Sequence, residues 1–469
     1  MGRRAFTGVL ARVGGVAAAA CVFLGLVCAR LPAWAADDGV IVLRLDEPET
    51  ASQEKTPDAG PVVPGLTDHR ALRVIDVPPR VERPVPKPAV KAASVVLMDA
   101  ENGQVLYSKN PHVRRPNAST TKIMTAILLI EHCKMTDMIR ASKKACETPY
   151  TSIHLKPGEQ ISARDLLMAL MVRSANDAAV AAAEHIAGST GKFAQMMNKK
   201  AREIGCTDTH FVTPNGLYSK DHYSSAYDLC LLARYAFRYP VFNEAISTRK
   251  YFLDSRTINR KDLAVFSRCK FLKEYSGADG AKTGYIKQAG YCLVGSATRD
   301  GWRLVCAVLK SDNAGRDVAT AMDYGFSNFQ PYLIARAGTP FAGVEVKGGA
   351  SESVPAAPVK DVRVVVPRTG AQIITWIEPA SIEAPVEKGT KVGTLVASVN
   401  GEPVVRVDMT AVDDVGISVA RRALRWTKIG LIILAVAAVG RRYGTASAKS
   451  ARRRRHRLAA SLRGLDRFR

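Results

Sequence analysis

Three short motifs carry residues that together could perform acyl transfer: Ser119-Thr120-Thr121-Lys122, Ser174-Ala175-Asn176 and Lys282-Thr283-Gly284. A serine becomes a nucleophile when a nearby base removes its proton, and a lysine can be that base if its surroundings lower its pKa. A second serine can relay a proton, an amide can hold a substrate peptide group, and a cation can bind a carboxylate. The set predicts a serine enzyme that works without a catalytic histidine.

The order of the motifs makes the signal specific, because the spacing Ser-x-x-Lys alone recurs by chance. It is also found at Ser52–Lys55, Ser189–Lys192, Ser247–Lys250 and Ser267–Lys270. The Ser-x-Asn at Ser398–Asn400 follows Lys-Thr-Gly instead of preceding it, and Lys-Thr-Gly occurs once. The set that begins at Ser119 has the order used by class A β-lactamases and penicillin-binding proteins, and it alone also has suitable neighbouring residues at every motif.

A buried helix is predicted directly after Ser119. Apolar residues follow at helical spacing, namely Ile123, Met124, Ala126, Ile127, Leu128 and Ile130. In the first turn, Ser119 would lie near free backbone N–H groups and the positive end of the helix dipole. Lys122, three residues later, would share its face of the helix.

The other two motifs are predicted at element boundaries. Ser174-Ala175-Asn176 separates two helical stretches, and either Asn176 or Asp177 could cap the second one. Lys282 is predicted to open a strand that continues to Gly295. Gly284 would let a substrate backbone approach this strand closely.

Beyond the three motifs, the chain resembles low-molecular-mass penicillin-binding proteins of the D-alanyl-D-alanine carboxypeptidase family. The resemblance extends to Ser94–Ala100, Gly103–Tyr107, Arg115–Ala118, Phe193, Met196–Asn198, Thr213–Leu217, Ser225–Leu229, Gly277–Gly280, Gln288–Leu293 and Asp323–Phe326. There are two departures. Ile286 stands where the family usually has threonine, and Asn117 stands where proline is commoner.

The resemblance implies an acyl-enzyme mechanism with three catalytic residues. Ser119 would attack the carbonyl between two D-alanines, Lys122 would be the general base, and Ser174 would help to pass the proton to the departing D-alanine. The backbone N–H groups of Ser119 and Tyr285 would hold the oxyanion. Penicillins should acylate Ser119, because they resemble this substrate.

The resemblance also implies a set of substrate-binding residues. Asn176 would bind a substrate amide, while Lys282 and Thr283 would hold the terminal carboxylate. Gly284 and Tyr285 would lie along the bound peptide. The implied partners are peptidoglycan stem peptides ending in D-Ala-D-Ala, with β-lactam antibiotics as inhibitors.

Three other functions use similar residues or the same substrate. A β-lactamase would need a base for rapid deacylation, usually in a Glu-x-x-Leu-Asn loop, and no such loop lies between Ser174 and Lys282. A D,D-endopeptidase acting on cross-linked peptidoglycan would use the same residues, so it stays open. A catalytically inactive peptidoglycan-binding scaffold would have no need for the pair Ser119 and Lys122.

The first 90 residues contain an export signal and a linker. Arg3, Arg4 and Arg12 precede an apolar core over 13–29 and the sequence Ala33-Trp34-Ala35, which is a signal-peptide pattern over 1–35. An uncleaved N-terminal anchor is the alternative. Residues 36–90 are rich in proline, valine and acids, which predicts an extended linker.

The fold class predicted for the rest is α+β. Residues 91–332 are expected to form a β-lactamase/transpeptidase-like catalytic domain, a sheet flanked by a helical cluster with Ser119 between them. From 337 to 412 short alternating stretches, punctuated by Gly and Pro, predict a small β-domain.

The C-terminus is predicted to bind a membrane through a helix over 423–440. Residues 429–440 alone would be about 18 Å long as a helix, short of the roughly 30 Å hydrocarbon core. The extended helix would therefore span the bilayer or lie at its interface.

Most of the net charge of +24 lies in this region and the basic tail 441–469. That pattern favours a cytoplasmic tail beside anionic lipid over nucleic-acid binding. The catalytic domain would then lie outside the cytoplasmic membrane of a bacterial envelope.

No cofactor and no metal are predicted. The histidines do not cluster at metal-ligand spacing, and there is no Cys-x-x-Cys. Seven of the nine cysteines follow the signal segment. A disulfide between two of them is possible, but the sequence does not say which pair would form it.

Overall fold

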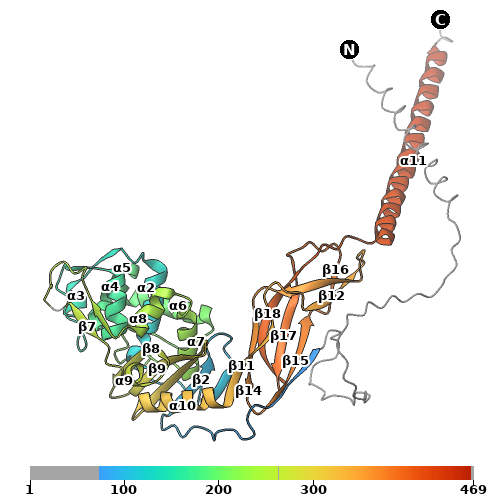
Figure 1. The fold of residues 1–469 in the computed structure, drawn as a ribbon. Coiled ribbons are helices and arrows are strands. Elements are labelled where there is room, and N and C mark those ends of the chain that lie inside the picture. The colour runs from blue at the N-terminus through green and yellow to red at the C-terminus, as the bar shows by residue number, and fades with distance from the viewer. Residues whose placement is uncertain (1–72, 262, 466–469) are drawn as a thin grey trace, which may run out of the picture. The chain divides into compact units, whose positions relative to one another are not determined.

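The computed structural model describes residues 73–261 and 263–465, which form an α+β region, a β-rich region and a long final helix (Figure 1). The predicted signal peptide (1–35) lies outside the described residues, as does the part of the predicted linker before residue 73.

The α+β region is built on a five-stranded antiparallel sheet in the order β3-β2-β10-β9-β8. Its strands are β2 (Ser94–Asp99), β3 (Val105–Lys109), β8 (Ala278–Ile286), β9 (Gly290–Arg299) and β10 (Trp302–Ser311). All six residues of β2 are buried, as expected for a strand covered on both faces. Strand β8, which carries Lys282, is an edge of the sheet.

Helices cover both faces of this sheet. Val96 and Met98 of β2 belong to the core beneath the large helical cluster, and Val95 and Leu97 belong to the core under α9 and α10. The helices are α2 (Lys122–His132), α3 (Lys143–Cys146), α4 (Ala163–Met168), α5 (Asn176–Ala187), α6 (Thr190–Ile204), α7 (Ala226–Ala236), α8 (Pro240–Ser247), α9 (Lys270–Glu274) and α10 (Ala314–Asn328).

Shorter elements complete the region. A 3-10 turn (Ala118–Thr121) precedes α2, and a π-helical turn (Ala169–Arg173) follows α4. Two small antiparallel ribbons pair β4 (Met138–Arg140) with β5 (Gln160–Ser162), and β6 (Lys250–Phe252) with β7 (Ala264–Phe266). Together with the sheet and its helical cluster, these elements confirm the predicted α+β catalytic domain with Ser119 between the two parts.

Three of the recurring Ser-x-x-Lys tetrads have structural roles. Ser189 is the N-cap of α6 and accepts a hydrogen bond from the backbone N–H of Lys192. Ser247 donates to the carbonyl of Glu244, and Ser267 accepts from the N–H of Cys269. The spacing is therefore common because caps and turns also use serine.

A buried ion pair joins the loop before β5 to the segment after β6. Arg256 Nε donates to Glu159 Oε1 at 2.9 Å, and neither side chain is exposed. The Arg256 guanidinium also donates to the carbonyl of Ile153 at 2.8 Å and to that of His154 at 3.2 Å. Burying a charged pair is tolerated only when the remaining donors and acceptors are satisfied, and here they are.

The β-rich region contains a seven-stranded sheet in the order β1-β15-β17-β18-β13-β12-β16. Its strands are β1 (Arg73–Val77), β12 (Ala342–Lys347), β13 (Ser353–Pro358), β15 (Ala371–Glu378), β16 (Ser381–Glu383), β17 (Lys391–Val399) and β18 (Glu402–Ala411). A separate two-stranded ribbon pairs β11 (Phe329–Ala335) with β14 (Val362–Pro367). A small β-domain after the catalytic region is thus confirmed.

Strand β1 comes from the segment predicted to be linker. It pairs antiparallel with β15, and its alternate residues Ile75 and Val77 pack on the core of this region. The sequence Val-Ile-Asp-Val alternates as a half-buried edge strand does. Its partner lies about 300 residues away, so local composition does not reveal the pairing.

The final helix, α11, runs from Val419 to Leu465 (Figure 1). Large apolar side chains between Leu424 and Val439 are exposed, including Trp426, Leu431 and Ile433. Among the described residues, no helix has a stretch long and apolar enough to cross a membrane.

We predict that Arg256→Met destabilises the catalytic domain by about 3–5 kcal/mol, because it leaves the Glu159 carboxylate buried without its counter-charge. The free energy of unfolding of the purified chain in urea measures this change. The control is Arg164→Met, which removes a half-exposed ion pair with Glu244 in the same domain and should cost about 1 kcal/mol or less. Equal effects of the two substitutions would contradict the prediction.

Candidate active site

The nucleophile candidate Ser119 lies on the 3-10 turn that leads into α2. Two threonines hold this turn through their own backbone. Thr120 Oγ1 donates to the carbonyl of Asn117 at 2.6 Å, and Thr121 Oγ1 donates to that of Ala118 at 2.7 Å. The first eight residues of α2 are buried. The turn is thus fixed at the end of a core helix, while Ser119 stays partly exposed.

Lys122 is the centre of the hydrogen-bond network. Its Nζ lies 2.8 Å from Ser119 Oγ, 2.7 Å from Asn176 Oδ1 and 2.8 Å from the carbonyl oxygen of Asn215. The side chain is completely buried. Burial lowers the pKa of Lys122 well below its usual value, and the positive charge of Lys282 lowers it further, with Asp177 opposing in part.

These contacts suit a neutral lysine. A neutral amine has two N–H donors and one lone pair. Asn176 Oδ1 and the Asn215 carbonyl can only accept, so they would take the two N–H groups. The lone pair would then face the Ser119 hydroxyl, the one partner that can donate. This is the geometry of a base ready to remove the Ser119 proton.

Ser174 and Asn176 lie where the chain turns from the π-helical segment into α5. Ser174 ends that segment in a left-handed conformation, with φ of 67°. Asn176 is the first residue of α5, and Ala175 is its N-cap. The predicted capping role of Asn176 or Asp177 is therefore wrong, because the Asn176 side chain is turned toward Lys122 and its Nδ2 donates to the carbonyl of Pro149 at 2.8 Å.

Asp177 orders the loop that holds Asn176 in place. Its buried carboxylate accepts from Ser152 Oγ at 2.6 Å, from Ile153 N at 3.2 Å and from Leu155 N at 3.1 Å. The same loop supplies the Thr151 carbonyl, which accepts from Asn176 N at 2.7 Å. The backbone N–H and the side-chain Nδ2 of Asn176 are thus both held by this loop, which directs its Oδ1 toward Lys122.

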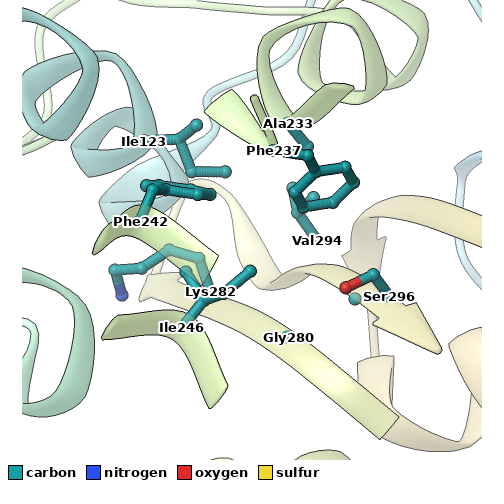
Figure 2. Close-up of a pocket in the computed structure, with 10 residues that line it drawn as sticks. Ile123, Ala233, Phe237, Phe242, Ile246, Gly280, Lys282, Val294 and Ser296 are labelled. Atoms are coloured by element: carbon teal, nitrogen blue, oxygen red, sulfur yellow. The ribbon is translucent and has the colours of Figure 1, made fainter. Parts of the chain in front are cut away.

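Lys282 lies within β8 and not at its start, since the strand begins at Ala278. Only 2% of the residue is exposed. Its aliphatic part lines a small apolar pocket with Ile123, Phe242 and Ile246, and its nitrogen points away from Phe237 (Figure 2). This burial lowers the pKa of Lys282 to about 7.

The Lys282 amine links the strand to the second motif. Lys282 Nζ donates to Ser174 Oγ at 2.9 Å and to the carbonyl of Thr283 at 2.8 Å. The structure therefore contains two lysine–serine pairs, Lys122 with Ser119 and Lys282 with Ser174. The two lysines are close enough that the charge of Lys282 lowers the pKa of Lys122.

Gly284 allows β8 to approach the nucleophile. A Cβ at this position would lie 3.1 Å from the carbonyl oxygen of Asn117 and only 2.9 Å from Ser119 N, and the second distance is shorter than real Cβ contacts. Thr283 and Tyr285, on either side of Gly284, are exposed. The Tyr285 ring packs against Tyr291, with centroids 4.6 Å apart.

The site also contains residues that lie outside the three motifs. The Asn215 carbonyl is a direct partner of Lys122, yet its contribution comes from the backbone, so residue type gives little signal. His222 is buried and contacts Thr121 Oγ1 at 2.8 Å, although sequence spacing gave it no role. The segment 213–217 resembles the family, and this was the one available hint. The seven cysteines of the described chain are free thiols.

Comparison with known proteins identifies related families. The model of the D-alanyl-D-alanine carboxypeptidase family matches residues 81–313, and that of the C-terminal domain of penicillin-binding protein 5 matches residues 329–416. The chain is 33% identical to D-alanyl-D-alanine carboxypeptidase DacF of Bacillus subtilis, over 70% of this chain and 86% of the relative. It is 31% identical to DacA of Escherichia coli K12, over 68% and 82% of the two chains.

The fold is also shared with solved structures. Penicillin-binding protein 5 of Haemophilus influenzae superposes with a TM-score of 0.62 at 29% identity, covering 71% of this chain and 99% of that one. The carboxypeptidase DacD of Francisella tularensis gives a TM-score of 0.53 at 28% identity, covering 72% and 98%. Sequence, fold and the arrangement of the three motifs agree, and the chain belongs to the D-alanyl-D-alanine carboxypeptidase family.

Proposed function

We propose that this serine-type peptidase removes the terminal D-alanine from peptidoglycan stem pentapeptides through an acyl-enzyme on Ser119. The observation that carries the proposal is the buried Lys122 amine, 2.8 Å from Ser119 Oγ and held by two further acceptors. Burial lowers the pKa of this lysine, which favours the neutral form that can take the serine proton.

In the first step Lys122 removes the proton from Ser119 as Oγ attacks the carbonyl carbon of the penultimate D-alanine. The carbonyl oxygen becomes an oxyanion, which the N–H groups of Ser119 and Tyr285 stabilise. The close approach of β8 to Ser119 N at Gly284 supports this pairing of donors.

The C–N bond then breaks, and the departing D-alanine needs a proton on its nitrogen. Ser174 is the proposed relay, with the Lys282 amine at 2.9 Å to hold its hydroxyl. By this route the proton that Lys122 took from Ser119 passes to the nitrogen of the departing D-alanine. Lys122 is then neutral again, as it was before the reaction. Water then attacks the ester, releases the shortened peptide and restores Ser119.

Substrate recognition is assigned to the groups around this centre. Lys282 and Thr283 are proposed to hold the terminal carboxylate, and Asn176 to bind an amide of the peptide through its side chain. A groove lined by Pro149, Lys144 and Asn215, among others, adjoins the site. It offers space for the part of the stem peptide before the scissile bond.

β-Lactams are proposed to acylate the same Ser119, because their strained amide presents a carbonyl and a carboxylate as the substrate does. The proposed location is the cell envelope, after export directed by residues 1–35.

The apolar and basic parts of α11 are proposed to attach the protein to the membrane. The exposed apolar residues between Leu424 and Val439 would enter the lipid interface. The exposed arginines beyond them, such as Arg452 and Arg453, would contact anionic headgroups.

We predict that Ser119→Ala abolishes labelling by a fluorescent penicillin and reduces D-alanine release from a pentapeptide to background, because no oxygen remains to form the ester. In-gel fluorescence and an assay of free D-alanine measure the two effects. Ser189→Ala is the matched control, since it changes another Ser-x-x-Lys serine whose role is to cap α6, and it should label normally.

An unlabelled native protein would refute the acyl-enzyme assignment. The same assays also separate carboxypeptidase from endopeptidase action: release of D-alanine from the pentapeptide is expected to exceed cleavage of a cross-linked dimer. The opposite preference would favour the endopeptidase.

We predict a bell-shaped pH dependence of kcat/KM. Lys122 must be neutral, so activity falls by about tenfold per pH unit below its lowered pKa. Lys282 must be charged to hold the carboxylate, so activity also falls above its pKa of about 7, mainly through a higher KM. Lys282→Arg should move the alkaline limb upward, because arginine stays protonated. An alkaline limb that does not respond to this substitution would assign it to another group.

We predict that replacing Arg452, Arg453 and Arg455 by serine weakens binding to anionic phosphatidylglycerol vesicles about 100-fold, since each cation near the surface contributes roughly 1 kcal/mol. Flotation of the full chain with vesicles measures binding, and zwitterionic vesicles should show a smaller change. A charge-matched control replaces the exposed Lys192, Lys199 and Lys220 of the catalytic domain. Equal losses in both triple variants would argue against a specific role for α11.

A further inference from the structure

His222 is a buried histidine outside the three motifs that bridges two segments of the active site. Only 3% of the residue is exposed, and its ring packs edge-on against Phe211, with centroids 5.6 Å apart. One ring nitrogen contacts the segment that ends at Asn215, and the other contacts the turn that carries Ser119.

The hydrogen-bond partners determine which ring nitrogen carries the proton. His222 Nδ1 accepts from the backbone N–H of Val212 at 3.0 Å and from that of Thr213 at 3.3 Å. If Nδ1 carried a proton, that N–H would face the two backbone N–H groups, and none of the three would have an acceptor there. Nδ1 is therefore the unprotonated nitrogen, and Nε2 carries the hydrogen.

The protonated nitrogen extends the chain of hydrogen bonds to the nucleophile turn. Thr121 Oγ1 donates to the carbonyl of Ala118, so its contact of 2.8 Å with His222 Nε2 must be one in which the threonine accepts. Thr121 Oγ1 also accepts from Asn117 Nδ2 at 3.0 Å. The Thr121 hydroxyl thus donates one hydrogen bond, to the Ala118 carbonyl, and accepts two, from Asn117 Nδ2 and from His222 Nε2.

Each end of this bridge lies against a group that contacts Lys122. The segment held by Nδ1 continues to the Asn215 carbonyl, 2.8 Å from Lys122 Nζ. Its next residue, Gly216, packs so tightly on the Ala118 carbonyl that a Cβ would lie 1.9 Å from that oxygen. The turn held by Nε2 carries Ser119, the other partner of Lys122.

The surroundings keep the ring neutral. Burial lowers the pKa of His222 to about 4, and two nearby groups, His210 and Lys122, contribute in the same direction. Protonation would add a donor at Nδ1, where two N–H groups already point. The bridge therefore keeps its donor–acceptor pattern as long as the ring stays neutral.

We propose that His222 is a positioning residue for acyl transfer: its neutral Nε2–H form sets the Asn215 carbonyl and the Ser119 turn at the spacing that directs the Lys122 lone pair to Ser119. The inference rests on the proposed function, since it assigns His222 a role in the same reaction. In this proposal the His222 side chain does not contact the substrate and acts through the two segments that it joins.

The geometry predicts a specific kinetic effect. If the Asn215 carbonyl shifts, Lys122 loses one of its two pure acceptors, and its N–H groups and lone pair can reorient. Proton removal from Ser119 then slows, while the groups proposed to bind the carboxylate on β8 are untouched. The loss should appear in the acylation rate or kcat and not in KM, and a misplacement of about 1 Å can cost roughly 100-fold.

Two substitutions test the ends of the bridge separately in the full chain. In His222→Asn the side-chain oxygen can replace Nδ1, but the amide is too short to reach Thr121. In His222→Gln the amide can replace Nε2–H, but it cannot serve the Val212 and Thr213 N–H groups as Nδ1 does. Both variants are expected to acylate with fluorescent penicillin about 10–100-fold more slowly per folded molecule, with little change in KM for pentapeptide.

Matched variants separate this role from simple loss of stability. Met322→Ala removes a buried side chain from α10, on the other face of the sheet, and should lower Tm without slowing acylation of the folded fraction. Thr121→Val keeps His222 but removes the hydroxyl of the bridge and should reproduce the slow acylation, with Thr121→Ser recovering much of the rate. This pair keeps the test decisive if the histidine variants do not fold.

The outcomes are distinguishable from failure of the proposed function. If the native chain labels at Ser119 while Thr121→Val and both histidine variants acylate at the native rate, the positioning role is refuted and the acyl-enzyme stands. Histidine ring 15N NMR of the native chain gives an independent check. A neutral Nε2–H form of His222 near pH 7 is expected, and a cationic or Nδ1–H ring would overturn the proposal.

Discussion

The rest of the active site depends on one constraint, a buried lysine amine that has no carboxylate among its described hydrogen-bond partners. Lys122 is fully enclosed, and its Nζ contacts only uncharged oxygens of Ser119, Asn176 and Asn215 among the described hydrogen bonds. An ion pair would keep the amine charged and useless as a base. A fully apolar pocket would leave its N–H groups unpaired at a cost of about 1–3 kcal/mol each. Neutral acceptors satisfy the amine without stabilising the cation as strongly as a carboxylate would.

Those acceptors come from separate segments, and each segment needs its own support. Asn176 is fixed by the loop that Asp177 and the Arg256–Glu159 pair hold. The Asn215 carbonyl belongs to a segment held by His222, which also reaches the Ser119 turn. Buried polar groups in these loops therefore affect the reaction indirectly. They position the two acceptors, and a shift in either acceptor would redirect the Lys122 lone pair. The large helical core beneath them provides the rigid base.

The sheet contributes the opposite wall of the site. Strand β8 is an edge strand, so its outer backbone groups are free of a neighbouring strand within the described sheet. An edge strand is normally a liability, because it can pair with other chains. Here it is what an extended peptide substrate needs, and Gly284 lets it approach Ser119 N. Lys282 adds a second buried amine on the same strand, and its positive charge lowers the pKa of Lys122.

By itself the sequence determined the reaction class, because the residues proposed to carry it are side chains whose types and order can be read along the chain, namely Ser119, Lys122, Ser174, Asn176 and Lys282. It also determined the α+β domain and the following β-domain, since helical spacing and strand alternation are local patterns. Only the tertiary structure decided the remaining parts. Asn215 contacts Lys122 through a backbone carbonyl, His222 has partners 10 and 101 residues away, and β1 pairs with a strand about 300 residues later. Such contacts leave no local pattern, because they exist only when distant segments are packed together.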